Sequence, residues 1–163
     1  MQRVAIQTAD FDVAAEIAAL RGRDGRVGAV CSFLGTVRDR SDGSTVQSME
    51  LEHYPGMTER SIESMIDEAM RRFDILGARV VHRVGLLGPA DQIVLVVVTS
   101  AHRSESFRAC EFLMDYLKTQ APFWKKEQTP QGARWVDARV SDDAALARWG
   151  ITGTGNAGDA IKR

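Results

Sequence analysis

The longest uninterrupted apolar run of this 163-residue chain, Ile93–Val98, limits its possible folds more than any other segment. A run of this length is far too short to cross a bilayer as a helix, which takes about 20 apolar residues. It therefore predicts a buried strand over 92–99. A strand predicted over 78–84 precedes it across the turn Gly88–Asp91, and such a pair is typical of a β-hairpin.

The rest of the hydrophobic pattern predicts further strands and helices, with a polar loop between two of them. The further strands are predicted over 3–7, 27–37, 46–54, 123–128 and 133–138, the last two on either side of the turn Thr129–Gly132. The helices are predicted over 10–20, over 58–73 with Thr58 as the N-cap, over 104–119 with Ser104 as the N-cap, and over 142–149. The loop over 38–44 has no apolar anchor, so we expect it to be mobile.

These elements predict the fold class. The two hairpins, over 78–99 and 123–138, exclude a purely parallel sheet, and we expect an α+β fold. The length suits one domain, which we place over 1–149. The segment 150–163 is rich in glycine, and we expect it to be a disordered tail.

Charge and cysteine usage exclude several classes of protein. The formal net charge of −1 gives no overall positive field for a nucleic-acid backbone, so any anion site must be local. Cys31 and Cys110 lie in separate apolar runs and form no disulfide framework, which suits a reducing compartment. The segment 1–10 is too polar for a secretion signal, so we expect a soluble intracellular protein. The histidines and cysteines lack metal-ligand spacing, and we expect no metal site.

The segment Thr99–Ser106 is a candidate anion site, because a buried strand ends there and a helix begins. Unpaired N–H groups at a helix start, the positive end of the helix dipole and Arg103 would together bind an anion. His102 could donate to the same anion or move a proton. The alternative is that Ser104 only caps the helix and His102 packs on the surface.

Three lysines are candidates further along the chain. Lys118 lies in the last turn of a predicted helix, and the residues alone favour a simple interaction with the negative end of the helix dipole. The alternative is that Lys118 projects into a pocket as an acid, a base or a nucleophile. Lys125 and Lys126 face opposite sides of a predicted strand, so only one of them is expected to be functional. A solvated lysine on an edge strand remains the alternative for either.

Arg38 is a further candidate for ligand binding. It follows Gly35-Thr36-Val37 at the end of a predicted strand, where a ligand could approach closely. No lysine followed by serine or threonine completes a phosphate-binding loop there. A loop arginine of this kind is commonly just solvated, and both interpretations stay open.

Four motifs resemble the large (catalytic) subunits of molybdopterin synthase, the MoaE family, over about residues 28–149. They are LEHYPGMT at Leu51–Thr58, TSAHR at Thr99–Arg103, MDYLKT at Met114–Thr119 and APFWKKE at Ala121–Glu127. The resemblance implies an α/β hammerhead fold with an additional antiparallel β-sheet. It also implies a cytoplasmic homodimer at the centre of a heterotetramer, with no metal and no cofactor.

The resemblance implies a sulfurtransferase of molybdenum cofactor biosynthesis. Each large subunit of the family binds a small ubiquitin-like sulfur-carrier subunit, whose C-terminal Gly-Gly tail carries a thiocarboxylate. The substrate is cyclic pyranopterin monophosphate (precursor Z), and the product is the dithiolene, molybdopterin. One tail delivers one sulfur, so two loaded carriers are consumed in turn.

The family's functional residues map onto separate parts of this sequence. The resemblance makes Lys118 the leading catalytic residue and Lys125 its helper, which selects Lys125 over Lys126. It assigns substrate binding to Arg38, His102 and Arg103, with Phe33 and Met114 as neighbours, and allows one cation to come from the other subunit of the dimer. The alternatives are a phosphate- or nucleotide-sensing module that uses only His102 and Arg103, and a scaffold that only docks a ubiquitin-like partner.

Overall fold

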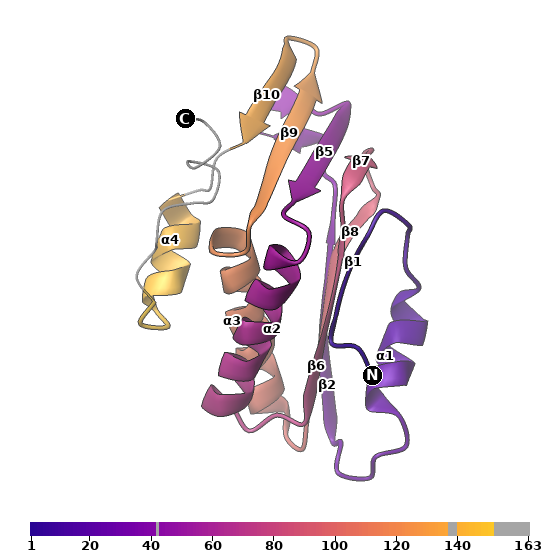
Figure 1. The fold of residues 1–163 in the computed structure, drawn as a ribbon, viewed down its shortest axis with the longest axis vertical. Helices are drawn as coiled ribbons and strands as arrows, with labels where there is room; N and C mark the ends of the chain where they lie inside the picture. Colours follow the sequence, from indigo (N-terminus) through magenta and orange to yellow (C-terminus); the bar gives the residue numbers. More distant parts are fainter. Residues whose placement is uncertain (42, 137–139, 152–163) are drawn as a thin grey trace.

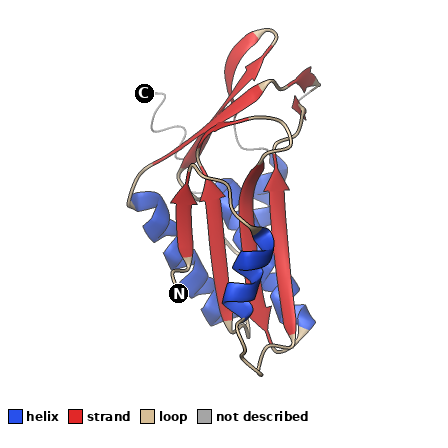
Figure 2. Cartoon of the chain, turned by 90° about the vertical axis from the view of Figure 1, so that its right-hand side faces the viewer, coloured by secondary structure: helices blue, strands red, loops and turns tan. Residues whose placement is uncertain are grey.

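Two four-stranded sheets make up the frame of the computed structural model, which describes residues 1–41, 43–136 and 140–151 (Figures 1 and 2). The first sheet has the order β1 (Val4–Gln7), β6 (Gly77–Arg83), β8 (Gln92–Ser100) and β2 (Ala29–Thr36). Only β1 and β6 run parallel in it. The second sheet is antiparallel throughout and has the order β10 (Gly132–Val136), β9 (Phe123–Thr129), β5 (Ser48–His53) and β7 (Gly85–Leu87). This mixture confirms the α+β prediction.

Helices cover both faces of the first sheet. Helix α1 (Val13–Arg21) lies on one face, while α2 (Met57–Arg72) and α3 (Arg103–Thr119) lie on the other, with α4 (Val140–Ala147) outside them (Figure 1). Burial on both faces of the sheet explains the apolar run in β8. Its alternate side chains Val94, Val96 and Val98 join the core under α2 and α3, while Leu95 and Val97 pack toward α1. A strand buried on both faces needs no polar side.

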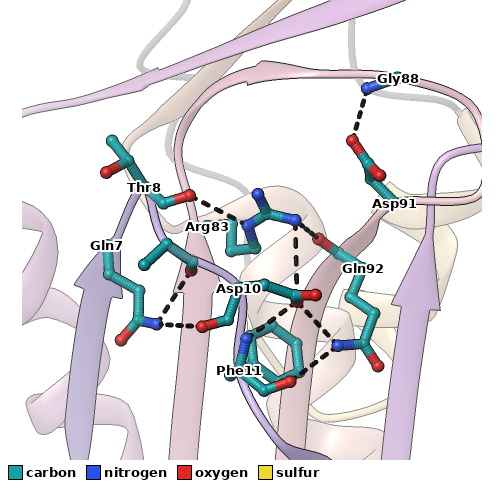
Figure 3. Close-up of polar contacts among 9 residues, drawn as sticks. Gln7, Thr8, Asp10, Phe11, Arg83, Gly88, Asp91 and Gln92 are labelled. Atoms are coloured by element: carbon teal, nitrogen blue, oxygen red, sulfur yellow. Dashed lines mark hydrogen bonds and ion pairs between the residues drawn. The ribbon is translucent and has the colours of Figure 1, made fainter.

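Arg83, at the end of β6, fixes the connection between β1 and α1 (Figure 3). Its guanidinium donates to the backbone oxygens of Thr8 and Gln92, at 3.2 and 3.1 Å. The Gln92 amide in turn donates to the Asp10 carboxylate and to the Phe11 oxygen, at 2.8 and 2.9 Å. These bonds, of which the two from Arg83 and the one to Asp10 are charge-assisted, hold the end of β6 and the start of β8 beside the start of α1.

The start of α2 corrects one prediction, because Thr58 is not its N-cap. The cap is Gly56, whose φ of 84° favours glycine and whose N–H donates to the Glu59 carboxylate at 2.6 Å. The helix therefore begins before Thr58, which is fully buried inside its first turn. The Thr58 hydroxyl donates to the Pro122 oxygen at 3.0 Å. It thus ties α2 to the connection between α3 and β9.

The start of α3 corrects a second prediction, because its N-cap is His102 and not Ser104. Ser104 is exposed within the first turn, and no side chain caps the helix. Instead, the Ser100 hydroxyl donates to the His102 carbonyl at 2.5 Å and fixes the strand-to-helix turn. The first N–H groups of α3 are therefore left without a side-chain acceptor.

The segment 38–44 corrects a third prediction, since it is not a plain loop. Strands β3 (Arg40–Ser41) and β4 (Ser44–Thr45) pair in a small hairpin, and Gly43 has a φ of 79° in the turn. Such two-residue turns favour glycine with positive φ, a signal that the polar composition concealed. The predicted strand end at 137–138 and most of the predicted tail, 152–163, lie outside the described residues. No helix in the described part is long and apolar enough to span a membrane.

Candidate active site at the two ends of helix α3

Helix α3 separates the candidate cations into two groups. It follows β8 directly and runs back along the first sheet, where it packs on β8 and β2. Its 17 residues span about 24–26 Å at a rise of 1.5 Å per residue. His102 and Arg103 lie at its beginning and Lys118 at its end.

The N-terminal end of α3 borders a hollow of 390 Å³ lined by Gly28, Ala101, His102, Arg103 and Ser104. The uncapped N–H groups of the helix and the exposed Arg103 side chain give this hollow a positive character. Gly28 permits the close approach of the two chain segments. A Cβ on Gly28 would lie 2.2 Å from the Ala101 carbonyl oxygen, so no other residue fits there without a shift of the backbone.

The C-terminal end of α3 brings Lys118 near the start of β9. The chain turns through Ala121–Pro122, and Phe123 then begins β9 with its ring stacked on His82, at 3.9 Å between centroids and 17° between planes. The Lys118 charge acts on the same histidine. Lys125 follows Phe123 on the same face of the strand. Lys118 and Lys125 therefore lie around one corner of the molecule, beside Phe123.

A buried carboxylate orients Lys125. Glu127 is only 2% exposed, and its Oε1 lies 3.8 Å from Lys125 Nζ. Arg134, opposite Glu127 on β10, donates to the other carboxylate oxygen at 3.3 Å. Lys126 faces the other side, with its Nζ 5.8 Å from the Trp135 ring centroid. The predicted alternation along β9 is confirmed, and Lys125 is the lysine that faces inward.

Arg38, Phe33 and Met114 lie toward the Lys118 end of the molecule. Strand β2 runs from its pairing with Ser100 to its pairing with Gln92, in the same direction as α3, and the exposed Arg38 follows its end. Cys31 of β2 contacts Cys110 of α3 through their thiols, and burial raises the Cys110 pKa. Phe33 lies two residues after Cys31 on β2, and Met114 lies about one helical turn after Cys110 on α3. Both steps cover a similar length, so Phe33 and Met114 lie at the same level along the sheet. One more turn of α3 leads to Lys118.

One chain therefore brings some of the predicted residues together and not others. Arg38, Lys118 and Lys125 gather at one end with Phe33 and Met114, whereas His102 and Arg103 lie at the far end of α3. A single site that uses all of them requires a second copy of the chain. In the described residues, no three histidine, cysteine or acidic side chains gather as metal ligands.

Sequence reasoning did not single out His82, the buried histidine beside Lys118. Burial is the main cause that lowers the pKa of His82 to about 4. A hydrogen bond to Arg83 acts in the opposite direction, and repulsion from Lys118 and His53 adds to the lowering. His82 is therefore neutral at pH 7. No motif marks it, because its environment comes from α3, β5 and β9, which are distant in sequence.

The lowered pKa of His82 predicts a loss of stability in acid. Below pH 6.5 the unfolded chain takes up a proton that the folded protein excludes until about pH 4. The free energy of unfolding should therefore fall across this interval, by about 3 kcal/mol in total from this group. Urea unfolding of the wild type and of His82→Phe at several pH values measures it. Equal pH slopes in the two proteins would contradict the prediction.

Comparison with known proteins identifies the family of this chain. A profile of the family described as MoaE protein matches residues 6–120. A relative from Ralstonia nicotianae, named molybdopterin synthase catalytic subunit, is 66% identical over 151 residues, which cover 93% of this chain and 86% of that protein. The expected family resemblance is thus confirmed.

Solved structures share the fold. The molybdopterin biosynthesis MoaE protein from Burkholderia ambifaria is 58% identical and superposes with a TM-score of 0.79, covering 93% of this chain and 99% of that chain. A protein–protein complex of subunits 1 and 2 of molybdopterin-converting factor from Helicobacter pylori matches with a TM-score of 0.68 over 83% of this chain and 91% of that chain. At 20% identity, this second likeness shows the fold alone. Because the family profile spans most of the chain and the Ralstonia relative aligns with nearly all of it, this chain belongs to the MoaE family of molybdopterin synthase catalytic subunits.

Proposed function

We propose that this chain transfers sulfur from the thiocarboxylate tail of a small ubiquitin-like carrier to cyclic pyranopterin monophosphate, and so forms the dithiolene of molybdopterin. The observation that carries the proposal is that His82, on which the charge of Lys118 acts, is stacked on Phe123, two residues before Lys125 on the same strand. Family membership supplies the substrate and the carrier as the expectation to test. We place the reaction in the cytoplasm.

The chemistry requires cations where two anions meet. The carrier thiocarboxylate and the substrate phosphate repel each other unless positive side chains lie between them. A hydrogen bond from Arg or Lys to such an anion contributes on the order of 1.5–3 kcal/mol. In our proposal, Lys118 transfers protons at the attacked carbon and Lys125 stabilises oxyanion charge that develops during transfer. Arg38, His102 and Arg103 bind the phosphate and the pterin, with Phe33 and Met114 beside them.

The distance along α3 gives the proposal its quaternary form. Since His102 and Arg103 lie a helix length from Lys118, we propose a homodimer in which these two residues come from the partner subunit. Closed twofold dimers are the commonest soluble oligomers and repeat such a shared site twice. One carrier per chain would complete a heterotetramer. Membership of the family supports a carrier partner for this chain.

A phosphate-binding module without catalysis is the second candidate, and the hollow at the start of α3 favours it. Uncapped N–H groups, His102 and Arg103 are sufficient to bind a phosphate there. Such a module has no use for the inward-facing Lys125 or for the buried Glu127 that holds it. For this reason we place the enzyme first.

The decisive experiment is a reconstituted reaction. Purified chain, thiocarboxylated carrier and precursor Z are mixed, and the dithiolene is measured after oxidation to a fluorescent pterin. Product that depends on both the chain and the loaded carrier supports the proposal. Saturable carrier binding without product would favour a scaffold, and phosphate or pterin binding without carrier binding would favour the sensing module. A carrier lacking its terminal glycines is the negative control.

A further inference from the structure

His82 is a buried titratable residue beside Lys118 for which the proposed chemistry has no role. It lies near the end of β6 and is 8% exposed. Its ring is stacked flat on Phe123, and the ring of His53 lies on Phe123 as well, at 6.5 Å between centroids and tilted by 35°. The orientation of the His82 ring is therefore fixed by packing.

The hydrogen bond of His82 fixes which ring nitrogen carries the proton. Nδ1 lies 2.8 Å from the Arg83 carbonyl oxygen. A carbonyl oxygen can only accept, so Nδ1 is the donor and, in the neutral ring, Nε2 holds a lone pair. The Arg83 backbone is itself held in place, because the Arg83 side chain donates to Thr8 and Gln92 (Figure 3).

The Nε2 atom of His82 is available as an acceptor. Within the described part of the chain, no donor forms a hydrogen bond with Nε2. Every side-chain nitrogen or oxygen there that is inaccessible to solvent has a hydrogen-bond partner, so Nε2 cannot be one of these inaccessible atoms. Nε2 is therefore reached from outside the core. The titratable groups around the ring are Lys118 from α3 and His53 from β5, and His53 Nε2 lies 3.5 Å from the Glu59 carboxylate of α2.

Lys118 differs from Lys125 in how its charge is held. Lys125 is tied to the buried Glu127, whereas none of the ion pairs among the described residues involves Lys118. A lysine side chain samples many rotamers when nothing holds it, so its ammonium group has no fixed direction. A carboxylate partner would aim it but would also offset the positive charge that two anionic reactants need. A neutral imidazole acceptor aims the ammonium without this loss.

On the basis of the proposed function, we propose that His82 is the positioning residue for Lys118. When the site is filled, the lone pair of His82 Nε2 accepts a hydrogen bond from the Lys118 ammonium, directly or through one water. The stack on Phe123 and the bond to Arg83 hold the acceptor in place. His82 itself exchanges no proton with the substrate.

Three substitutions at His82 separate positioning from packing. Phenylalanine keeps a ring on Phe123 but removes both nitrogens. Asparagine reaches the position of Nδ1, and glutamine reaches the position of Nε2. Positioning therefore predicts that only His82→Gln restores the lost function, whereas a packing role predicts that His82→Phe is the best replacement.

The first test is steady-state turnover with precursor Z and loaded carrier. We expect His82→Phe and His82→Asn to lower kcat about 10- to 100-fold with KM for both reactants within about twofold of the wild type. His82→Gln should recover most of kcat. Wild-type kcat in His82→Phe, or equal recovery by asparagine and glutamine, would overturn the inference. Circular dichroism verifies the folding of each variant.

The second test does not depend on turnover and separates this inference from the proposed function. Long-range ¹H–¹⁵N spectra of the ring nitrogens are recorded for the full chain with thiocarboxylated carrier bound. We expect the His82 Nε2 resonance to shift on carrier binding in the wild type but not in Lys118→Met. An unshifted resonance in the wild type, or the same shift in both proteins, contradicts the positioning role. Absence of product from the wild type with the expected spectra would reject only the proposed function.

Discussion

Replacing Lys118 with alanine is expected to abolish dithiolene formation, with a fall in rate of about 10³-fold or more, since positioned acid–base groups contribute about 10²–10⁴-fold. The fold should survive, because the Lys118 side chain is exposed and makes no ion pair among the described residues. Surface substitutions of this kind change stability by about 0.5 kcal/mol or less. Carrier binding should also stay within about twofold of the wild type, because the effect is on the chemical step.

Single-turnover formation of the dithiolene measures this effect, and Lys126→Ala is the matched control. Lys126 is also a lysine of this region, but it faces away from Lys125 toward Trp135. It should therefore keep wild-type turnover. Unchanged turnover in Lys118→Ala would remove Lys118 from the mechanism, and an equal loss in both variants would point to a general effect of surface charge.

Mixing two inactive variants is expected to restore activity, which is the second large effect. Arg103→Ala and Lys118→Ala each damage one end of α3. If one site takes Lys118 from one subunit and Arg103 from the other, a mixed dimer contains one intact site and one doubly damaged site. Random exchange of subunits then restores roughly a quarter of the wild-type activity, since half of the dimers are mixed. Activity is measured after the two variants are unfolded and refolded together.

The control for mixing uses two variants with damage at the same end. Lys118→Ala and Lys125→Ala lie around one corner, so a mixed dimer of these two chains has no intact site and should remain inactive. Recovery in this control would mean that Lys118 and Lys125 serve different sites. No recovery with Arg103→Ala and Lys118→Ala, despite verified subunit exchange, would rule out the shared site.

Much of the fold could be predicted because its strongest signals are local. The run Ile93–Val98 marked an inner strand of the first sheet, and the turn Thr129–Gly132 marked the hairpin of β9 and β10. β6 and β8 pair antiparallel as predicted, but β7, which pairs with β5 in the other sheet, lies in their connection and was not predicted. The errors came from competing local signals. Thr58 and Ser104 are good capping residues, but Gly56 and the Ser100–His102 bond set the helix starts instead. In the segment 38–44 the polar composition concealed a glycine turn.

The candidate site could be predicted in part, for similar reasons. Strand alternation placed Lys125 on the face of Glu127, and the structure confirms this arrangement. The predicted helix over 104–119 matches α3, but the sequence analysis did not infer from its length that Arg103 and Lys118 lie far apart. The surroundings of His82 could not be predicted, because Phe123, His53 and Lys118 reach it only through packing between elements that are distant in sequence.

The pairing of β9 has a consequence for the twin lysines. β9 is held on both sides, by β5 and by β10, so neither edge is free to slip. A slip by one position would exchange the two faces, turning Lys126 and Trp124 inward and swinging the Glu127 carboxylate out into water. Lys126 therefore cannot replace Lys125. Only the present register places an inward-facing ammonium group next to the Glu127 carboxylate that orients it.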